Sequence, residues 1–211
     1  MTLRIALAGA ALALTTATAQ AQDFTIKAGA TLTSNYLLHG ITQTRNAPAL
    51  QPYVEIEHYG LYAGLWASNV RFPGSRDRFE LDAYVGYRNH FGAFGFDVGY
   101  ARYLYNNSGD CCGELLLSVG YETLQGMSFG ADAGYDPGSS ARRGSLSAGW
   151  EMDGRISFSA ETGRVSGSHN FWNAGMGVNV VDNVALDLRL HDTTVTSPRM
   201  TAAVSFDFSL R

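Results

Sequence analysis

The sequence predicts an all-β protein: a transmembrane, antiparallel, up-and-down β-barrel of about twelve strands. Three observations lead to this fold class. Apolar and polar residues alternate with a period of two along most of the chain. Short connections alternate with longer ones, and the chain opens with a segment typical of an exported protein.

The alternation is clearest near the carboxyl end, where Ala202, Val204, Phe206, Phe208 and Leu210 are separated by small or polar residues. Successive side chains of a strand point to opposite faces, so this period gives a sheet one apolar and one polar face. A soluble sheet buries its apolar face on a second layer. A membrane barrel turns that face to lipid and closes, so that no backbone edge is left unpaired.

Twelve segments carry this pattern, each roughly nine to eleven residues long, which is the length that a tilted membrane strand requires. The segment around Leu65 alternates least clearly. The expected strand centres are Gly29, Val54, Leu65, Ala83, Val98, Leu117, Ala131, Ala148, Phe158, Gly175, Leu188 and Ser205.

Short and long connections between these segments are expected to alternate along the chain. Outer-membrane barrels have short periplasmic turns and longer external loops, and an even strand number places both chain ends in the periplasm. A secreted β-sandwich, the alternative, gives no reason for such alternation. The short connections are 59–60, 90–93, 124–126, 153–154 and 182–183, and the long ones are 40–48, 71–78, 106–113, 136–144, 165–170 and 192–199.

The amino-terminal segment resembles a cleavable secretory signal peptide. A positively charged start at 1–4 is followed by a short apolar run at 5–14 and by the small-x-small sequence Ala19-Gln20-Ala21. The expected cut after Ala21 divides the chain into a leader, 1–21, and a single barrel domain, 22–211. A buried amino-terminal helix is the alternative for the leader.

Composition narrows the possible partners. No second apolar run is long enough for a transmembrane helix. The net charge is −4, and Lys27 is the single lysine of the chain, so nucleic acid is not an expected partner. The expected lipid-facing positions carry almost no charge, and aromatic residues recur near strand ends, where they form girdles in membrane barrels.

The polar face of each strand is where function is expected. A polar interior follows whether or not the barrel conducts, because charges are costly against lipid. As a pore wall it carries more acids than bases, which predicts a weak preference for cations. The expected pore-lining residues are Lys27, Glu55, Glu57, Glu80, Asp82, Arg88, Asp97, Glu114, Glu122, Asp132, Glu151, Glu161, Asp187, Arg189 and Asp207.

Two local motifs could carry other chemistry, namely a disulfide or metal site and a hydrolytic site. Cys111-Cys112, expected in an external loop, is interpreted as a disulfide between neighbours, with inter-chain linkage or a reduced pair as alternatives. The pair lacks the gap that lets two thiolates share one zinc, so no metal site is expected. Ser168-His169-Asn170 is the one arrangement reminiscent of a hydrolase, but adjacent residues point apart, so no catalytic residues, cofactor or enzyme activity is expected.

The segment 33–70 resembles the TorF-type family of outer-membrane porins. The similarity covers roughly a fifth of the chain, and the family's aromatic-Arg pair is replaced by Leu38-His39. The resemblance implies an outer-membrane barrel and suggests a channel. The similar stretches are Ser34-Asn35-Tyr36, Gly40-Ile41-Thr42-Gln43-Thr44, Pro48-Ala49-Leu50-Gln51, Tyr59-Gly60-Leu61-Tyr62-Ala63-Gly64 and Trp66-Ala67-Ser68-Asn69-Val70.

Together these features predict a porin-like channel in the outer membrane of a Gram-negative bacterium, through which small polar solutes diffuse. The alternative is a closed structural or adhesive barrel that acts through its external loops. The expected partners are outer-membrane lipid, the barrel-assembly machinery and small solutes or ions. A monomer is the expected state.

Overall fold

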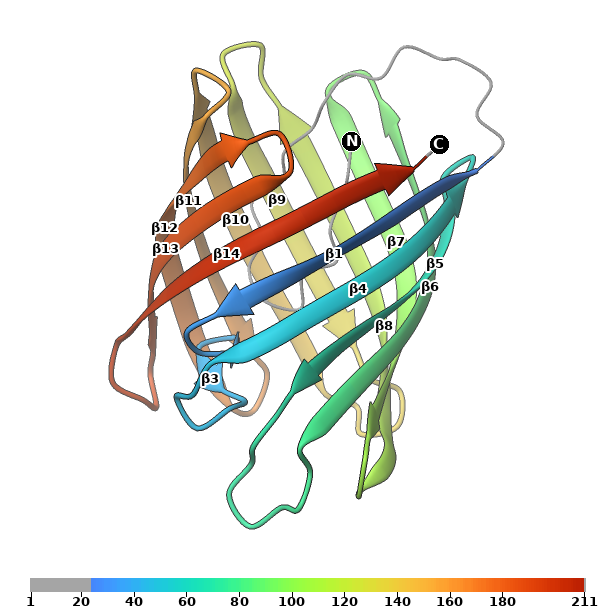
Figure 1. The fold of residues 1–211 in the computed structure, drawn as a ribbon, viewed down its shortest axis with the longest axis vertical. Helices are drawn as coiled ribbons and strands as arrows, with labels where there is room; N and C mark the ends of the chain where they lie inside the picture. Colours follow the sequence, from blue (N-terminus) through green and yellow to red (C-terminus); the bar gives the residue numbers. More distant parts are fainter. Residues whose placement is uncertain (1–23, 211) are drawn as a thin grey trace.

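The computed structural model describes residues 24–210, which form a closed barrel of twelve antiparallel strands (Figure 1). The predicted signal peptide, 1–21, lies outside the described residues. Within the described part of the chain, no helix is long and apolar enough to cross a membrane.

The barrel strands keep their hydrogen-bonded neighbours in chain order, and the first pairs with the last. Two very short strands, β2 (Leu37–Leu38) and β3 (Ile41–Thr42), form a separate hairpin between β1 and β4. The barrel strands are β1 (Thr25–Thr33), β4 (Ala49–His58), β5 (Leu61–Asn69), β6 (Phe79–Phe91), β7 (Phe94–Tyr105), β8 (Gly109–Glu122), β9 (Met127–Tyr135), β10 (Arg142–Met152), β11 (Ile156–Val165), β12 (His169–Val181), β13 (Val184–Thr193) and β14 (Arg199–Leu210).

The predicted fold class is therefore confirmed, and every expected strand centre falls inside a barrel strand. This includes Leu65 in β5, whose alternation is weak because two of the inward positions on that strand are filled by aromatic rings, Tyr62 and Trp66. Closure is complete: the ladder between β1 and β14 runs from Ile26 opposite Leu210 to Thr33 opposite Ala203. No backbone edge of the barrel is left for lipid to face, as a spanning sheet requires.

The two ends of the barrel differ. The turn end has the tight connections, and β1 begins and β14 ends there (Figure 1). The loop end has the hairpin β2–β3 and the longer connections, of which 34–48 and 70–78 are the largest. Two connections predicted to be long are short: 106–108 and 166–168 are turns, because the strands on either side continue further than the sequence indicated.

The same extension moves the cysteine pair. Cys111 and Cys112 lie in β8, close to the loop end, and not in a loop. A disulfide joins them. The ladder between β7 and β8 shifts register beside them, between Tyr103 and Leu104, so the pair lies at a local irregularity of an otherwise regular sheet.

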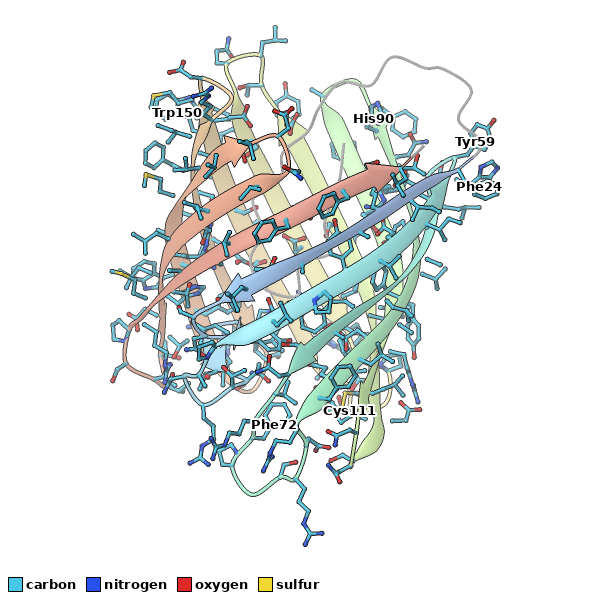
Figure 2. All side chains as sticks on the ribbon, viewed as in Figure 1. Phe24, Tyr59, Phe72, His90, Cys111 and Trp150 are labelled. Carbon is cyan, nitrogen blue, oxygen red and sulfur yellow. A yellow bond between two sulfur atoms is a disulfide. The ribbon has the colours of Figure 1, made fainter. Side chains whose placement is uncertain are left out.

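The outer face is apolar around the barrel. Large hydrophobic side chains such as Leu32, Val54, Leu117, Phe158 and Phe206 are between two-fifths and about half exposed, at positions that alternate with polar ones. Phe24, Tyr59 and Trp150 lie near the turn end (Figure 2), where aromatic residues suit a membrane surface. The apolar outer face is thus suited to contact with the hydrocarbon chains of lipid.

Candidate functional site: the barrel interior and its mouth

The inner face is identified by contacts that skip a strand. The Tyr62 hydroxyl of β5 donates to Asp97 Oδ1 of β7 at 2.5 Å, and Arg189 Nη2 of β13 donates to Ser159 Oγ of β11 at 2.8 Å. Side chains two strands apart in a closed sheet meet on its concave side. The residues expected to line a pore all share the strand parity of these inner contacts: Lys27, Glu55, Glu57, Glu80, Asp82, Arg88, Asp97, Glu114, Glu122, Asp132, Glu151, Glu161, Asp187, Arg189 and Asp207.

A buried ionic network lies toward the turn end. Arg88 Nη2 is 2.6 Å from Glu55 Oε1, and Lys27 Nζ is 2.5 Å from Glu57 Oε2 and 3.6 Å from Glu55 Oε1. The Arg88 guanidinium also lies over the Tyr62 ring, 3.9 Å from its centroid. These two acids are therefore largely balanced by bases, so the wall is less uniformly acidic than the list of charges implies.

Beneath this network, tyrosine rings lie against glycines of the neighbouring strand. Three cross-strand pairs have this form: Tyr62 opposite Gly86, Tyr84 opposite Gly64, and Tyr53 opposite Gly29. A Cβ atom at any of these glycines would clash with the ring of its partner. Sequence reasoning missed this packing, although a tyrosine opposite an inner-face glycine is a signal for it.

We call the inner face of β4–β7 the packed wall, because its aromatic and charged side chains are in contact with one another. The inner face of β9–β12, which we call the small-residue wall, is different. A Cβ atom at Gly130, Gly149 or Gly177 would meet the hydroxyl of a serine, which can rotate away. Its small residues are Ser128, Gly130, Gly134, Ser145, Ser147, Gly149, Ser157, Ser159, Gly163, Gly175 and Gly177.

Arg189 of β13 borders the small-residue wall and is almost fully buried. Its guanidinium donates to Asn173 Oδ1 at 2.7 Å and to Asp187 Oδ2 at 3.0 Å, in addition to Ser159. Nearer the loop end, Arg143 Nε of β10 donates to Glu114 Oε1 of β8 at 2.7 Å. Arg189 is thus held in place by three residues and Arg143 by two hydrogen bonds to one carboxylate, so each buried charge is partnered.

The hairpin β2–β3 lies in the mouth of the barrel at the loop end. At its base, Tyr36 packs with Ala49 and Val70, and its ring is 5.5 Å from that of Trp66 in β5. The turn at its tip has left-handed backbone conformations at His39 and Gly40, with φ of 49° and 79°. The conformation at Gly40 suits glycine, and a Cβ there would also clash with Thr193 at the end of β13.

The tip of the hairpin contacts the opposite side of the mouth. His169 Nε2 lies 2.9 Å from the His39 carbonyl oxygen, and the rings of His39 and Phe171 are 5.0 Å apart. Arg199 Nη1 of β14 donates to the Gly40 carbonyl at 3.3 Å. The hairpin therefore crosses the mouth, with its base on β4–β5 and its tip on β12–β14.

The contacts of the hairpin tip also set the protonation of His39. Burial, together with the nearby positive charge of Arg143 and the neighbouring His169, lowers the pKa of His39 to about 3. His39 is consequently neutral at ordinary pH. The sequence gives no direct signal for this arrangement, because the contacts join residues more than a hundred positions apart.

Two carboxyl groups beneath the hairpin have few partners. Asp82 has no exposed surface, and neither of its carboxylate oxygens has a hydrogen-bond partner among the described residues. Glu80, two residues earlier on β6, accepts from the Tyr105 hydroxyl at 2.7 Å through Oε1, while its Oε2 has no such partner. Hydrogen bonding inside the barrel therefore leaves Asp82 without a partner and Glu80 with one of its two oxygens unpaired.

Ser168-His169-Asn170, the hydrolase-like sequence, lies where β12 contacts the tip of the hairpin. Ser168 Oγ lies 2.8 Å from His169 Nδ1, whose other ring nitrogen is bound to the His39 carbonyl. Among residues 24–210, no group of three or more His, Cys, Asp or Glu side chains converges as a metal site would.

Comparisons with solved structures place this barrel in a known class. The KdgM porin superimposes with a TM-score of 0.65 at 8% sequence identity, covering 89% of this chain and 99% of that one. The NanC porin superimposes with a TM-score of 0.58 at 9% identity, covering 89% of this chain and all of that one. At such low identity the likeness shows the fold alone, which is that of small outer-membrane porins.

The family assignment is more direct. Residues 17–209 match the model of the Gcw_chp family, described as a bacterial protein of unknown function, and the chain belongs to that family. No curated protein matches the sequence. The resemblance to the TorF-type family is neither supported nor contradicted by these matches.

Proposed function

We propose that this protein is a TorF-type porin: a channel in the outer membrane of a Gram-negative bacterium for passive diffusion of small polar solutes. One observation carries this proposal. Most charged side chains of the strands lie on the inner face of a closed barrel, while large apolar side chains are exposed on the outer face. The outward-facing bases Arg102, Arg142 and Arg164 lie near the loop ends of their strands. That distribution suits a wall between hydrocarbon and an aqueous interior. Export through the periplasm follows from the predicted signal peptide.

The small-residue wall is the expected route for solutes. Its glycines and serines project least into the interior, whereas the packed wall carries tyrosine rings and an ion-pair network. Glu161 and Asp132 on the inner face have no base as an ion-pair partner among the ion pairs of the described residues. These acids support a weak preference for cations.

The experiment is single-channel recording from the refolded protein in a planar bilayer under a salt gradient. Discrete current steps with a cation-leaning reversal potential would support the proposal. Anion preference would contradict the proposed selectivity, and the absence of current from correctly folded barrels would contradict the channel itself.

A closed structural or adhesive barrel is the second candidate, and the hairpin β2–β3 favours it. Contacts at both sides of the mouth hold this hairpin across the interior. A variant that lacks residues 37–42 separates the two functions. If the intact barrel is silent and this variant conducts, the intact protein is closed; if both conduct, the hairpin narrows a channel that is already open.

Neither candidate involves catalysis. The Ser168–His169 contact resembles the first step of a nucleophilic relay, in which a histidine accepts a serine proton. The same geometry also anchors the hairpin through the His39 carbonyl. We infer that anchorage is its role, and a lipid-ester hydrolysis assay on the intact protein and on Ser168→Ala tests this: equal rates at background level are expected.

A further inference from the structure

The acidic pair of the packed wall, Glu80 and Asp82, is enclosed on every side. The two residues lie on the same face of β6, roughly 7 Å apart by strand geometry. Their exposed fractions are 3% and 0%. Three of their four carboxylate oxygens have no hydrogen-bond partner among the described residues.

Two such groups need a balancing positive charge. A carboxylate removed from water without partners is unstable by many kcal/mol, so buried acids are ordinarily paired with a base, bound to a metal or protonated. Within residues 24–210 no lysine, arginine or histidine forms an ion pair with Glu80 or Asp82. The ionic network around Arg88 engages Glu55 and Glu57 instead, and Arg143 pairs with Glu114.

The surroundings of the pair supply neutral oxygen atoms. Ser68, which is 1% exposed, is the cross-strand partner of Glu80, and Tyr103 is the cross-strand partner of Asp82. Tyr36, which is 2% exposed, covers the pair from the base of the hairpin and adds a phenolic oxygen to these surroundings.

We propose that Glu80 and Asp82, covered by Tyr36, bind a hard divalent metal cation, with Ca²⁺ as the best match. Hard cations take carboxylate, carbonyl and hydroxyl oxygens, and two carboxylates balance a charge of two. Because Tyr36 belongs to the hairpin, a cation at this place also ties β6 to the base of the hairpin. The sequence analysis expects no metal site, and the residue that covers the pair, Tyr36, lies far from β6 along the chain.

Terbium luminescence of the refolded full-length protein tests the binding. Tb³⁺ replaces Ca²⁺ at oxygen sites, and Tyr36, Tyr103 and Trp66 are placed to transfer excitation to it. We expect sensitised emission that Ca²⁺ competes away, and a dissociation constant raised at least about tenfold in Asp82→Asn, which preserves side-chain shape. Asp132→Asn, an inner-face acid on β9, is the matched control and is expected to bind as the intact protein does.

Protons are the rival source of the balancing charge. Absence of competable Tb³⁺ emission, together with an infrared carbonyl band of a protonated carboxyl group that disappears in Asp82→Asn, would overturn the proposal. Equal affinity of Asp82→Asn and the intact protein would overturn the assignment to this place. If Asp82→Asn fails to fold, Glu80→Gln serves as the second variant.

The link to the hairpin has its own readout. Arg45 is exposed beside the hairpin and offers trypsin a cleavage site. Removing Ca²⁺ with a chelator is expected to speed cleavage there in the intact protein but not in Asp82→Asn; equal rates with and without Ca²⁺ would contradict the link. These measurements need no current through the barrel, so their failure and the failure of the proposed channel are distinguishable.

Discussion

The packed wall and the small-residue wall are both built from long antiparallel strands, yet their inner faces are packed differently. On β4–β7 the inner-face glycines Gly64 and Gly86 make room for aromatic rings of the neighbouring strand, those of Tyr84 and Tyr62. On β9–β12 three inner-face glycines, Gly130, Gly149 and Gly177, have serine hydroxyls as neighbours. The same residue type therefore supports dense packing in one wall and low bulk in the other.

From this difference we expect stability to depend mainly on the packed wall and permeation on the small-residue wall. A tyrosine ring that packs over a glycine of the neighbouring strand is buried and makes many close contacts. Both effects stabilise the folded barrel. Small hydroxylated residues contribute little packing but leave polar, unobstructed surface. Substitutions in the packed wall should consequently change stability most, and those in the small-residue wall should change conduction.

The largest effect is expected from Tyr62→Ala. The ring is 2% exposed, lies beneath Arg88 and donates to Asp97, so its loss leaves a cavity and a buried carboxylate with one partner fewer. We expect unfolding in urea, with the barrel in lipid vesicles, to show a loss of about 3–5 kcal/mol. Ser147→Ala in the small-residue wall is the control. An equal loss of unfolding free energy there would contradict the larger contribution of the packed wall to stability.

Next in size are paired glycine substitutions. Gly86→Ala forces a methyl group against the Tyr62 ring and is expected to cost about 1–3 kcal/mol of unfolding free energy. Gly177→Ala meets the Ser157 hydroxyl, which can rotate, so a smaller loss is expected. Both are measured by the same urea titration, and a larger loss at Gly177 would contradict the distinction between the walls.

Conduction is the complementary test. Ser147→Trp adds bulk to the small-residue wall, so single-channel conductance is expected to fall to about half or less. Ala148→Trp, one residue along β10, faces outward and provides the matched control, which should conduct normally. Equal currents from both variants would show that solutes do not follow this wall.

The hairpin lies across the mouth between the two walls, so its release should raise the current moderately. Gly40→Leu introduces a side chain at a φ of 79° and against Thr193, which should move the tip away from β13. We expect larger or noisier single-channel steps. Gly74→Leu, with a φ of 76° in an open part of loop 70–78, carries the same backbone strain without the clash and should leave the current unchanged.

The smallest expected effect is a pH dependence at the hairpin tip. The pKa of His39 is about 3 when the tip is docked and about 6.5 when it is free, so docking favours the neutral ring. Docking is therefore fully stable above about pH 6.5 and weakens progressively as pH falls toward 3. Conductance measured over that range should rise more in the intact protein than in His39→Gln; an identical rise would assign the effect to the carboxylates.

The barrel itself was predictable because its signal is local. A period of two along each strand and the turn dipeptides between strands depend on neighbouring residues, so the expected centres from Gly29 to Ser205 all fall in strands. The predicted face of the charged residues follows from the same parity. Strand parity does not predict which charged side chains form ion pairs. Glu55 and Glu57 have no evident partner in the sequence, whereas in the structure Arg88 and Lys27 balance them.

The hairpin and the strand ends were missed for a related reason. Connection 40–48 was expected as an external loop, but it folds into the mouth because Tyr36 and the His39 turn find partners on distant strands. Connections 106–113 and 165–170 contain polar and glycine residues that resemble loops. They nevertheless extend the strands, since each strand continues the ladder of its neighbour beyond the expected end.

The ladder between β1 and β14 has a consequence for how this protein is made. Ile26 pairs with Leu210, so the last strand of the barrel closes the first, across nearly the whole length of the chain. Until that ladder forms, both strands present unpaired amide and carbonyl groups, which neither lipid nor a crowded compartment tolerates well. Completion therefore depends on β14, and a chain that lacks this strand would be an open, aggregation-prone sheet and not a smaller barrel.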